Sequence, residues 1–174
     1  MKTGKIEQKT IKQITKLIYL KARTAPKTKG IDNLRISILT AAQKTQLAKT
    51  MRKIGNEQNI HSFLRDAQNI EGAAMVIIFG IEANAADLKY CGLCQKKNCA
   101  QLTEEKGICV FNGIDLGIAL GSAVSLASTL GVDNRIMYTA GIAALKMNLF
   151  NKKVKIALAL PLSGTGKNIF FDRP

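Results

Sequence analysis

Four cysteines within a stretch of 19 residues carry the sharpest chemical signal in this sequence, at Cys91, Cys94, Cys99 and Cys109. Their spacing is C-x2-C-x4-C-x9-C, and they lie in the segment 90–115, YCGLCQKKNCAQLTEEKGICVFNGID. Sulfur binds a metal as the thiolate, so a group of cysteines in one loop is typical of a metal centre that keeps the sulfurs deprotonated.

The residues around the cysteines agree with a loop that wraps a metal. Gly92 and Gly107 loosen the backbone beside the first and last cysteines. Lys96, Lys97 and Lys106 add positive potential, which favours thiolates and an anionic cluster.

The cysteine spacing leaves three kinds of site open. Disulfides would staple only one loop, and the chain has no secretory signal segment. Structural zinc usually takes two short C-x2-4-C pairs, and only Cys91 and Cys94 form one. Iron–sulfur clusters accept looser spacing, often three close cysteines and one further along. The pattern therefore favours an iron–sulfur cluster over zinc and over a site without metal.

Length and composition indicate one cytoplasmic domain spanning residues 1–174, with 90–115 as a cysteine-rich metal loop within it. The apolar content is 47%, no apolar run reaches the length of a membrane span, and free thiols suit a reducing compartment. The net charge of +14 would suit a nucleic-acid binder, but the basic residues are dispersed and aromatic residues are only 5%. We expect neither nucleic acid nor a membrane as a partner. The basic surface would instead attract an acidic redox protein.

Periodicity and capping signals predict an α+β order of elements. Thr40 and Gln43 form a capping box that starts a helix. The continuous apolar run 73–81 is typical of a strand buried on both faces. We expect helices over 5–22, 40–54, 62–69, 115–132 and 138–149, with Asp115 as the cap of the fourth, and strands over 35–39, 73–81 and 154–161.

Two further features could suggest catalysis, and neither supports it. The segment SGTGK lacks the first glycine of a phosphate loop, because Pro161 stands there, and Asn168 replaces the required Ser or Thr. A turn is the simpler interpretation. His61 is the only histidine and has no evident partners, so we do not expect a hydrolytic triad.

Four segments together resemble a family of ferredoxin-domain proteins from anaerobic prokaryotes, which in turn is similar to the nitroreductases: ARTAPKTKGID, CGLCQKKNC, DLGIALGSAVSLASTLGVDNRIMYTAG and LPLSGTGKNIFFDR. The resemblance implies a nitroreductase-like mixed sheet flanked by helices, with an inserted four-cysteine loop. It also implies a homodimer built on the helix over 115–132, and a redox protein whose cysteines hold a [4Fe–4S] cluster.

The nitroreductase likeness further implies a flavin. Ala25 and Pro26 stand where that family has an A-P segment lining FMN, and Arg23, Lys27 and Arg173 are the candidate contacts to the FMN phosphate. The opening MKTGKIEQKT has no arginine where nitroreductases carry a phosphate-binding one. With a flavin the protein would be an FMN-dependent oxidoreductase. The alternative is a zinc-stabilised structural or regulatory module without catalysis.

Overall fold

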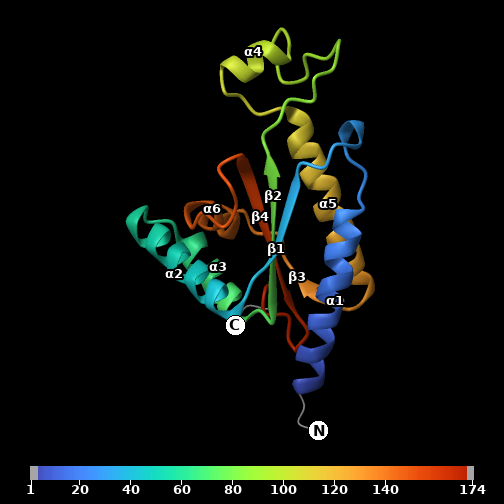
Figure 1. Ribbon diagram of the computed structural model, residues 1–174. Coiled ribbons are helices and arrows are strands. Elements are labelled where there is room, and N and C mark those ends of the chain that lie inside the picture. The colour runs from blue at the N-terminus through green and yellow to red at the C-terminus, as the bar shows by residue number, and fades with distance from the viewer. Residues whose placement is uncertain (1–3, 172–174) are drawn as a thin grey trace.

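A central sheet lies between two layers of helices in the computed structural model, which describes residues 4–171 (Figure 1). The elements in chain order are α1 (Lys5–Arg23), the 3-10 turn η1 (Thr28–Gly30), β1 (Leu34–Ile38), α2 (Ala41–Glu57), α3 (His61–Gly72), β2 (Met75–Glu82), α4 (Cys99–Glu104), α5 (Val110–Thr129), β3 (Asp133–Asn134), α6 (Tyr138–Lys146) and β4 (Val154–Ser163).

The sheet has the strand order β1-β2-β4-β3, and its pairings are all antiparallel among the described residues. The expected α+β class with helices flanking the sheet is confirmed. One detail differs, since a mixed sheet was expected. The helical hairpin α2–α3 reverses the chain, so that β2 runs antiparallel beside β1. The segment between β2 and β4 reverses it again, so that β4 runs antiparallel beside β2.

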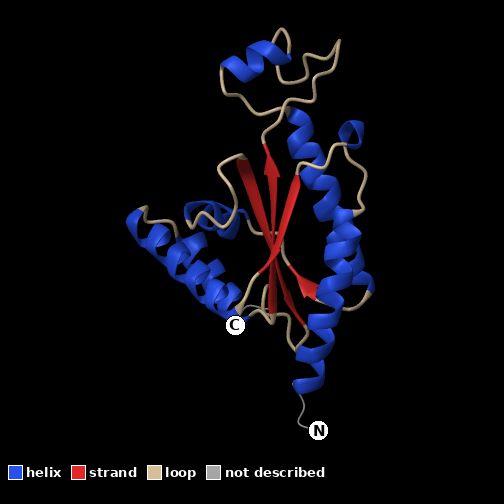
Figure 2. Cartoon of the chain, viewed as in Figure 1, coloured by secondary structure: helices blue, strands red, loops and turns tan. Residues whose placement is uncertain are grey.

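Strand β2 lies at the centre of the fold. Seven of its eight residues are buried, as the apolar run predicted. Helices α1 and α5 cover one face of the sheet, and α2, α3 and α6 cover the other (Figure 2). The side chains alternate between two cores: Ile77 and Phe79 belong to the first, and Val76 and Ile78 to the second. Antiparallel strands can be buried on both faces when helices cover both.

The two helix starts that the sequence suggested have different outcomes. Helix α2 begins as predicted, because Thr40 accepts a hydrogen bond from the backbone of Gln43 and the Gln43 side chain accepts from Thr40. The cap of α5 was wrongly placed at Asp115. The helix begins five residues earlier with Cys109 as its N-cap, and Asp115 is a buried residue of its second turn. Asp115 is held there by a contact from η1, distant in sequence.

Helix α5 presents an unusual exposed face. From residue 110 to residue 121, just over three turns, its solvent side carries only small and apolar residues: Val110, Gly113, Ile114, Gly117, Ile118 and Gly121. By length and composition α5 could cross a bilayer, which the sequence prediction did not anticipate. Its opposite side, however, packs against α1 and β2 and contributes Leu116, Leu120 and Ala123 to the core. This is the packing of a core helix in a compact fold.

The close contact of α6 with β4 requires a glycine at position 141. A Cβ atom on Gly141 would lie 1.8 Å from the carbonyl oxygen of Ala157. Because the obstacle is backbone, no side-chain rotation can relieve it.

We expect Gly141→Ala to separate α6 from the sheet and to lower the free energy of unfolding by about 3 kcal/mol. Urea denaturation measures the change. Gly166→Ala is the control, because a Cβ there meets no atom within 4 Å. Equal stability of the two variants would contradict the close approach.

Candidate metal centre

The cysteine segment projects from one end of the sandwich. It leaves β2 at Glu82, makes the short helix α4 and returns at the start of α5, so that it stands beyond the ends of the strands (Figure 1). None of the described residues between 83 and 115 belongs to either of the two cores. The segment is therefore an addition to the sandwich and not part of its packing.

All four cysteines line one cavity of about 140 Å³. Cys91 is exposed, Cys94 and Cys99 are half-buried, Cys109 is buried, and none of the four forms a disulfide. Lys89, Lys96 and Lys97 also border this cavity. Lys106, which the sequence placed in the same electrostatic environment, lines a neighbouring cavity instead.

The four cysteines border one common cavity. Among residues 4–171 no three His, Cys, Asp or Glu side chains come close enough together to hold a single metal ion. Thiolates about 2.3 Å from a tetrahedral zinc would be tightly grouped. A cluster of several irons and sulfides keeps its cysteine ligands further apart. Four cysteines that border one cavity are a donor set that an iron–sulfur cluster uses.

The backbone around the cavity suits a negatively charged occupant. Cys109 is the N-cap of the 20-residue helix α5, so the positive end of that helix dipole lies beside the cavity. Cys99 is the first residue of α4, which Asn98 caps by accepting a hydrogen bond from Gln101. Gly92 has φ of 87°, a left-handed conformation that favours glycine, as its place beside Cys91 suggested.

A half-buried ion pair holds the point where the chain leaves β2. The Glu82 carboxylate accepts hydrogen bonds from Asn151 Nδ2 at 3.0 Å and from Arg35 Nε at 3.1 Å. The hydrogen bond from Asn151 and the charge of Arg35 together lower the pKa of Glu82. Glu82 is 7% exposed, so this interaction ties β1, β2 and the turn before β4 to the base of the cysteine segment.

The end of the cysteine segment, where the chain enters α5, is held by contacts with η1 and with the residues that follow β2. Asp115 of α5 accepts hydrogen bonds from the backbone and hydroxyl of Thr28, at 3.0 and 2.9 Å. Asn112 donates to the carbonyl of Asn84 at 3.0 Å. The basic loop around η1 therefore lies against the helix that begins at the fourth cysteine. Sequence reasoning missed these contacts, because no local pattern joins residues this far apart.

The candidate FMN contacts are not assembled into one site. Arg23 donates to Asp32 and to the carbonyl of Leu34, both at 2.8 Å. The Lys27 amine donates to two backbone carbonyls, those of Arg23 and Ala25. Both cationic groups are thus used within their own loop. Arg173 lies outside the described residues. The assignment of these three residues to a phosphate stays a prediction.

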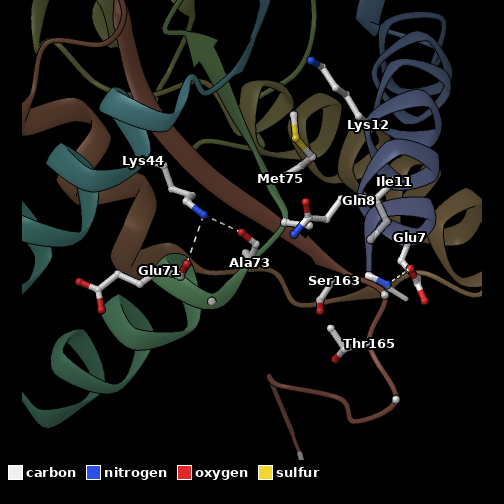
Figure 3. Close-up of a pocket in the computed structure, with 15 residues that line it drawn as sticks. Glu7, Gln8, Ile11, Lys12, Lys44, Glu71, Ala73, Met75, Ser163 and Thr165 are labelled. Carbon is white, nitrogen blue, oxygen red and sulfur yellow. Dashed lines mark hydrogen bonds between the residues drawn. The ribbon is translucent and has the colours of Figure 1, made fainter. Parts of the chain in front are cut away.

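A larger cavity lies elsewhere, between the first half of α1 and the turn after β4 (Figure 3). It measures about 650 Å³, and Glu7, Lys12, Lys44 and Met75 line it. The segment 163–166 forms another wall, so the SGTGK turn borders a cavity without being a phosphate loop. The Ser163 hydroxyl is buried there and has no hydrogen-bond partner among the described residues.

Comparison with solved structures identifies the fold class. The chain superimposes on nitroreductase CinD from Lactococcus lactis in complex with nicotinic acid with a TM-score of 0.62 and 15% identity, over 92% of this chain and 84% of that one. Nitroreductase A from Vibrio parahaemolyticus gives 0.60 and 15%, with 90% of this chain covering 60% of that structure. The FMN-dependent nitroreductase NfnB from Mycobacterium smegmatis, in complex with NADPH, gives 0.60 and 8%, over 89% and 78%. The fold is nitroreductase-like.

Sequence comparison places the chain in a family. It is 36% identical over 160 residues to an uncharacterized protein of Archaeoglobus fulgidus, covering 87% of this chain and 85% of that relative. Residues 105–173 match the family described as "uncharacterized protein containing a ferredoxin domain (DUF2148)". The chain belongs to this ferredoxin-domain family, as the four segments suggested. No finding supports zinc as the metal.

The anchor at Glu82 predicts a pH-dependent stability. A carboxylate whose pKa is lowered by folding stabilises the fold above its unfolded pKa, near 4.5, and this stabilisation is lost as the pH falls through the folded value. We expect Glu82→Gln to lower the free energy of unfolding by about 1–2 kcal/mol at pH 7. The difference from the unmodified protein should shrink below about pH 4. Urea denaturation at several pH values measures it, and a pH-independent difference would contradict this role.

Proposed function

We propose that this protein is a redox protein that carries an iron–sulfur cluster, [4Fe–4S] in type, on Cys91, Cys94, Cys99 and Cys109. Such a cluster takes up and releases one electron at a time. The single observation that supports this best is that four free thiols within a stretch of 19 residues line one cavity outside the hydrophobic core. The ferredoxin-domain family and the nitroreductase-like fold agree with a redox role.

The protein around the cysteines has a defined part in this proposal. The N-terminal end of α5 and the lysines that border the cavity would offset the negative charge of a cluster with four thiolates. The half-buried position of Cys94 and Cys99 leaves one side of the site near solvent, where a redox partner protein could exchange electrons. The reaction of the protein then depends on that partner and on any second redox group.

We extend the proposal to a flavin in the 650 Å³ cavity. The volume lies within the range of cofactor sites. The backbone of the turn 164–166, which borders this cavity, would face the phosphate of a flavin bound there, whereas Arg23 and Lys27 hydrogen-bond within their own loop. One of the fold relatives is by name an FMN-dependent nitroreductase. A flavin would supply a second redox group and make the protein an oxidoreductase.

We also propose that the protein is a homodimer that pairs through α5. Gly113, Gly117 and Gly121 repeat every four residues on the exposed face, and a Cβ on any of them would meet no atom within 4 Å. Ile114 and Ile118 beside them are 43% and 39% exposed. Apolar side chains interleaved with glycines allow another helix to approach closely, and burying them removes apolar surface from water.

The cluster proposal predicts a brown protein. After purification without oxygen, we expect a broad absorption from 300 to 600 nm, with iron and sulfide near stoichiometry. Serine at each of the four cysteine positions in turn should abolish or strongly reduce both, since every thiolate binds the cluster. Tyr90→Phe, beside Cys91 and almost fully exposed, is the control and should keep the cluster.

The same sample separates the alternatives. Resolved flavin bands would support the second redox group. A colourless protein that binds no iron after cluster reconstitution would rule out the cluster, and equimolar zinc with unfolding by a chelator would identify a structural zinc module instead.

The dimer proposal predicts that one substitution stabilises helix α5 but weakens the association of the two copies. Gly117→Ala should stabilise the isolated helix by about 1 kcal/mol, because alanine is the better helix former. At a close helix contact the added methyl group would separate the two copies, so the dissociation constant should rise about tenfold or more. Analytical ultracentrifugation measures this, with Lys49→Ala on the exposed side of α2 as the control. A monomer at all concentrations, or unchanged dimerisation in Gly117→Ala, would contradict the proposed interface.

A further inference from the structure

The cysteine cavity is lined by charge of one sign. Its charged lining residues are Lys89, Lys96 and Lys97, and none of the described carboxylates lines it. Lys96 pairs with Glu105. Lys89 and Lys97 are exposed and belong to no ion pair within residues 4–171. Two ammonium groups beside the four thiols are therefore available to a partner.

Positive charge continues onto the neighbouring surface. Lys106 and Lys155 line the adjacent cavity, and the Lys29 amine of η1 donates to the backbone carbonyl of Asp87 at 3.3 Å. The exposed carboxylates of Asp87 and Glu104 line neither cavity. The potential of exposed charges reaches about 8 Å at physiological ionic strength, so these lysines act on a bound cluster and on an approaching partner alike.

An aromatic side chain stands out from the same surface. Tyr90 is 98% exposed, although it lies between Lys89 and Cys91 in the chain and lines the cavity. Its neighbour Leu93 is 63% exposed and precedes Cys94. Tyrosine is enriched at the centres of protein interfaces, where its ring supplies apolar area and its hydroxyl a hydrogen bond. Tyr90 therefore has the chemistry of an interface anchor.

The position of the cysteine segment lets a whole protein reach the cavity. The segment stands beyond the ends of the strands (Figure 1). Cys91 is exposed, and Cys94 and Cys99 are half-buried. Complexes between redox proteins are small and bury less than about 1,200 Å² in total. A projecting segment with one anchor and a rim of lysines is sufficient for such a complex.

We propose that Lys89, Tyr90 and Lys97, which we call the docking surface, bind an acidic protein that carries one electron, such as an acidic ferredoxin. Carboxylates of the carrier would pair with the two lysines, and Tyr90 would pack between them. The proposal rests on the proposed function, because the electron passes from the reduced carrier to the cluster. The carrier is oxidised, the cluster is reduced, and no bond is made or broken.

The docking surface fits an acidic protein better than a nucleic acid. Single-stranded nucleic acid binds along a track of cations with several aromatic side chains on which successive bases stack. The segment 83–115 has two aromatic residues, and of these only Tyr90 is exposed, because Phe111 is half-buried. Nucleic acid is therefore an alternative for the experiment to exclude.

The experiment titrates an oxidised plant-type [2Fe–2S] ferredoxin, an acidic carrier, into the protein purified without oxygen and follows binding by calorimetry. Cytochrome c, a basic one-electron carrier, is the matched control. We expect ferredoxin to bind at least about tenfold more tightly than cytochrome c. Binding should weaken when the ionic strength rises from about 0.01 to about 0.15 M, because the Debye length shortens. Equal binding of the two carriers would overturn the proposal.

A pair of charge reversals tests where the carrier binds. Lys89→Glu together with Lys97→Glu should weaken ferredoxin binding about tenfold or more. Lys9→Glu together with Lys49→Glu, on exposed positions of α1 and α2, changes the net charge by the same amount and should weaken it less than about threefold. Equal weakening by both pairs would mean that only the net charge of +14 matters, and would overturn the docking surface.

A substitution at the anchor leaves the charge unchanged. Tyr90→Ala should weaken ferredoxin binding about fivefold or more, whereas Tyr90→Phe keeps the ring and should bind within about twofold of the unmodified protein. This pair still decides the question if the charge reversals lower the iron content. Unchanged binding in Tyr90→Ala would contradict the anchor. Binding of single-stranded DNA at about 0.15 M salt that depends equally on Lys89 and Lys97 would identify a nucleic-acid surface instead.

The absorption and iron content of the same sample keep the two proposals apart. A brown protein that binds ferredoxin no better than cytochrome c retains the cluster and overturns only the docking surface. A colourless protein without iron would overturn the proposed function before the titration begins. Ferredoxin binding that depends on Lys89 and Lys97 would then support the docking surface alone.

Discussion

The structure depends on one strand that is buried on both faces and paired on both edges. Strand β2 pairs with β1 and β4, and its alternating side chains contribute to two separate cores. Each face needs its own helical cover, which explains why the chain supplies α1 and α5 on one side and α2, α3 and α6 on the other. It also explains why small residues recur at the closest contacts, such as Gly141 against β4.

The same strand decides where chemistry can occur. A side chain inside either core would be sealed from solvent and from any partner, so reactive groups must lie beyond the ends of the strands. The cysteine segment begins directly at the end of β2, where Glu82, Arg35 and Asn151 fix the exit. Three buried polar residues within 4–171 that have an unpaired atom or no counter-charge, Ser163, Asn112 and Asp115, likewise lie at the two ends of the sandwich and line cavities there.

Sequence reasoning succeeded where the signal is local. The Thr40–Gln43 capping box, the buried run of β2 and the clustered cysteines all lie within short segments, and capping and periodicity are sufficient to identify them. It failed where distant segments meet. The start of α5 was misplaced because Asp115 resembles a helix cap, whereas Thr28 accounts for its position. The large cavity combines α1 with the turn after β4, and no local pattern connects them.

The cysteine segment makes up a separate unit in terms of local stability. Its ends are tied at Glu82 and at the first turns of α5, and none of the described residues between 83 and 115 contributes to the cores. Local unfolding of this excursion would therefore cost far less than global unfolding and would leave the sheet intact. Its backbone amides would exchange hydrogen with solvent much faster than those of β2. Cysteine ligation at four points would close this loop and slow that exchange. The exchange rate of these amides would therefore show whether the four cysteines hold a cluster.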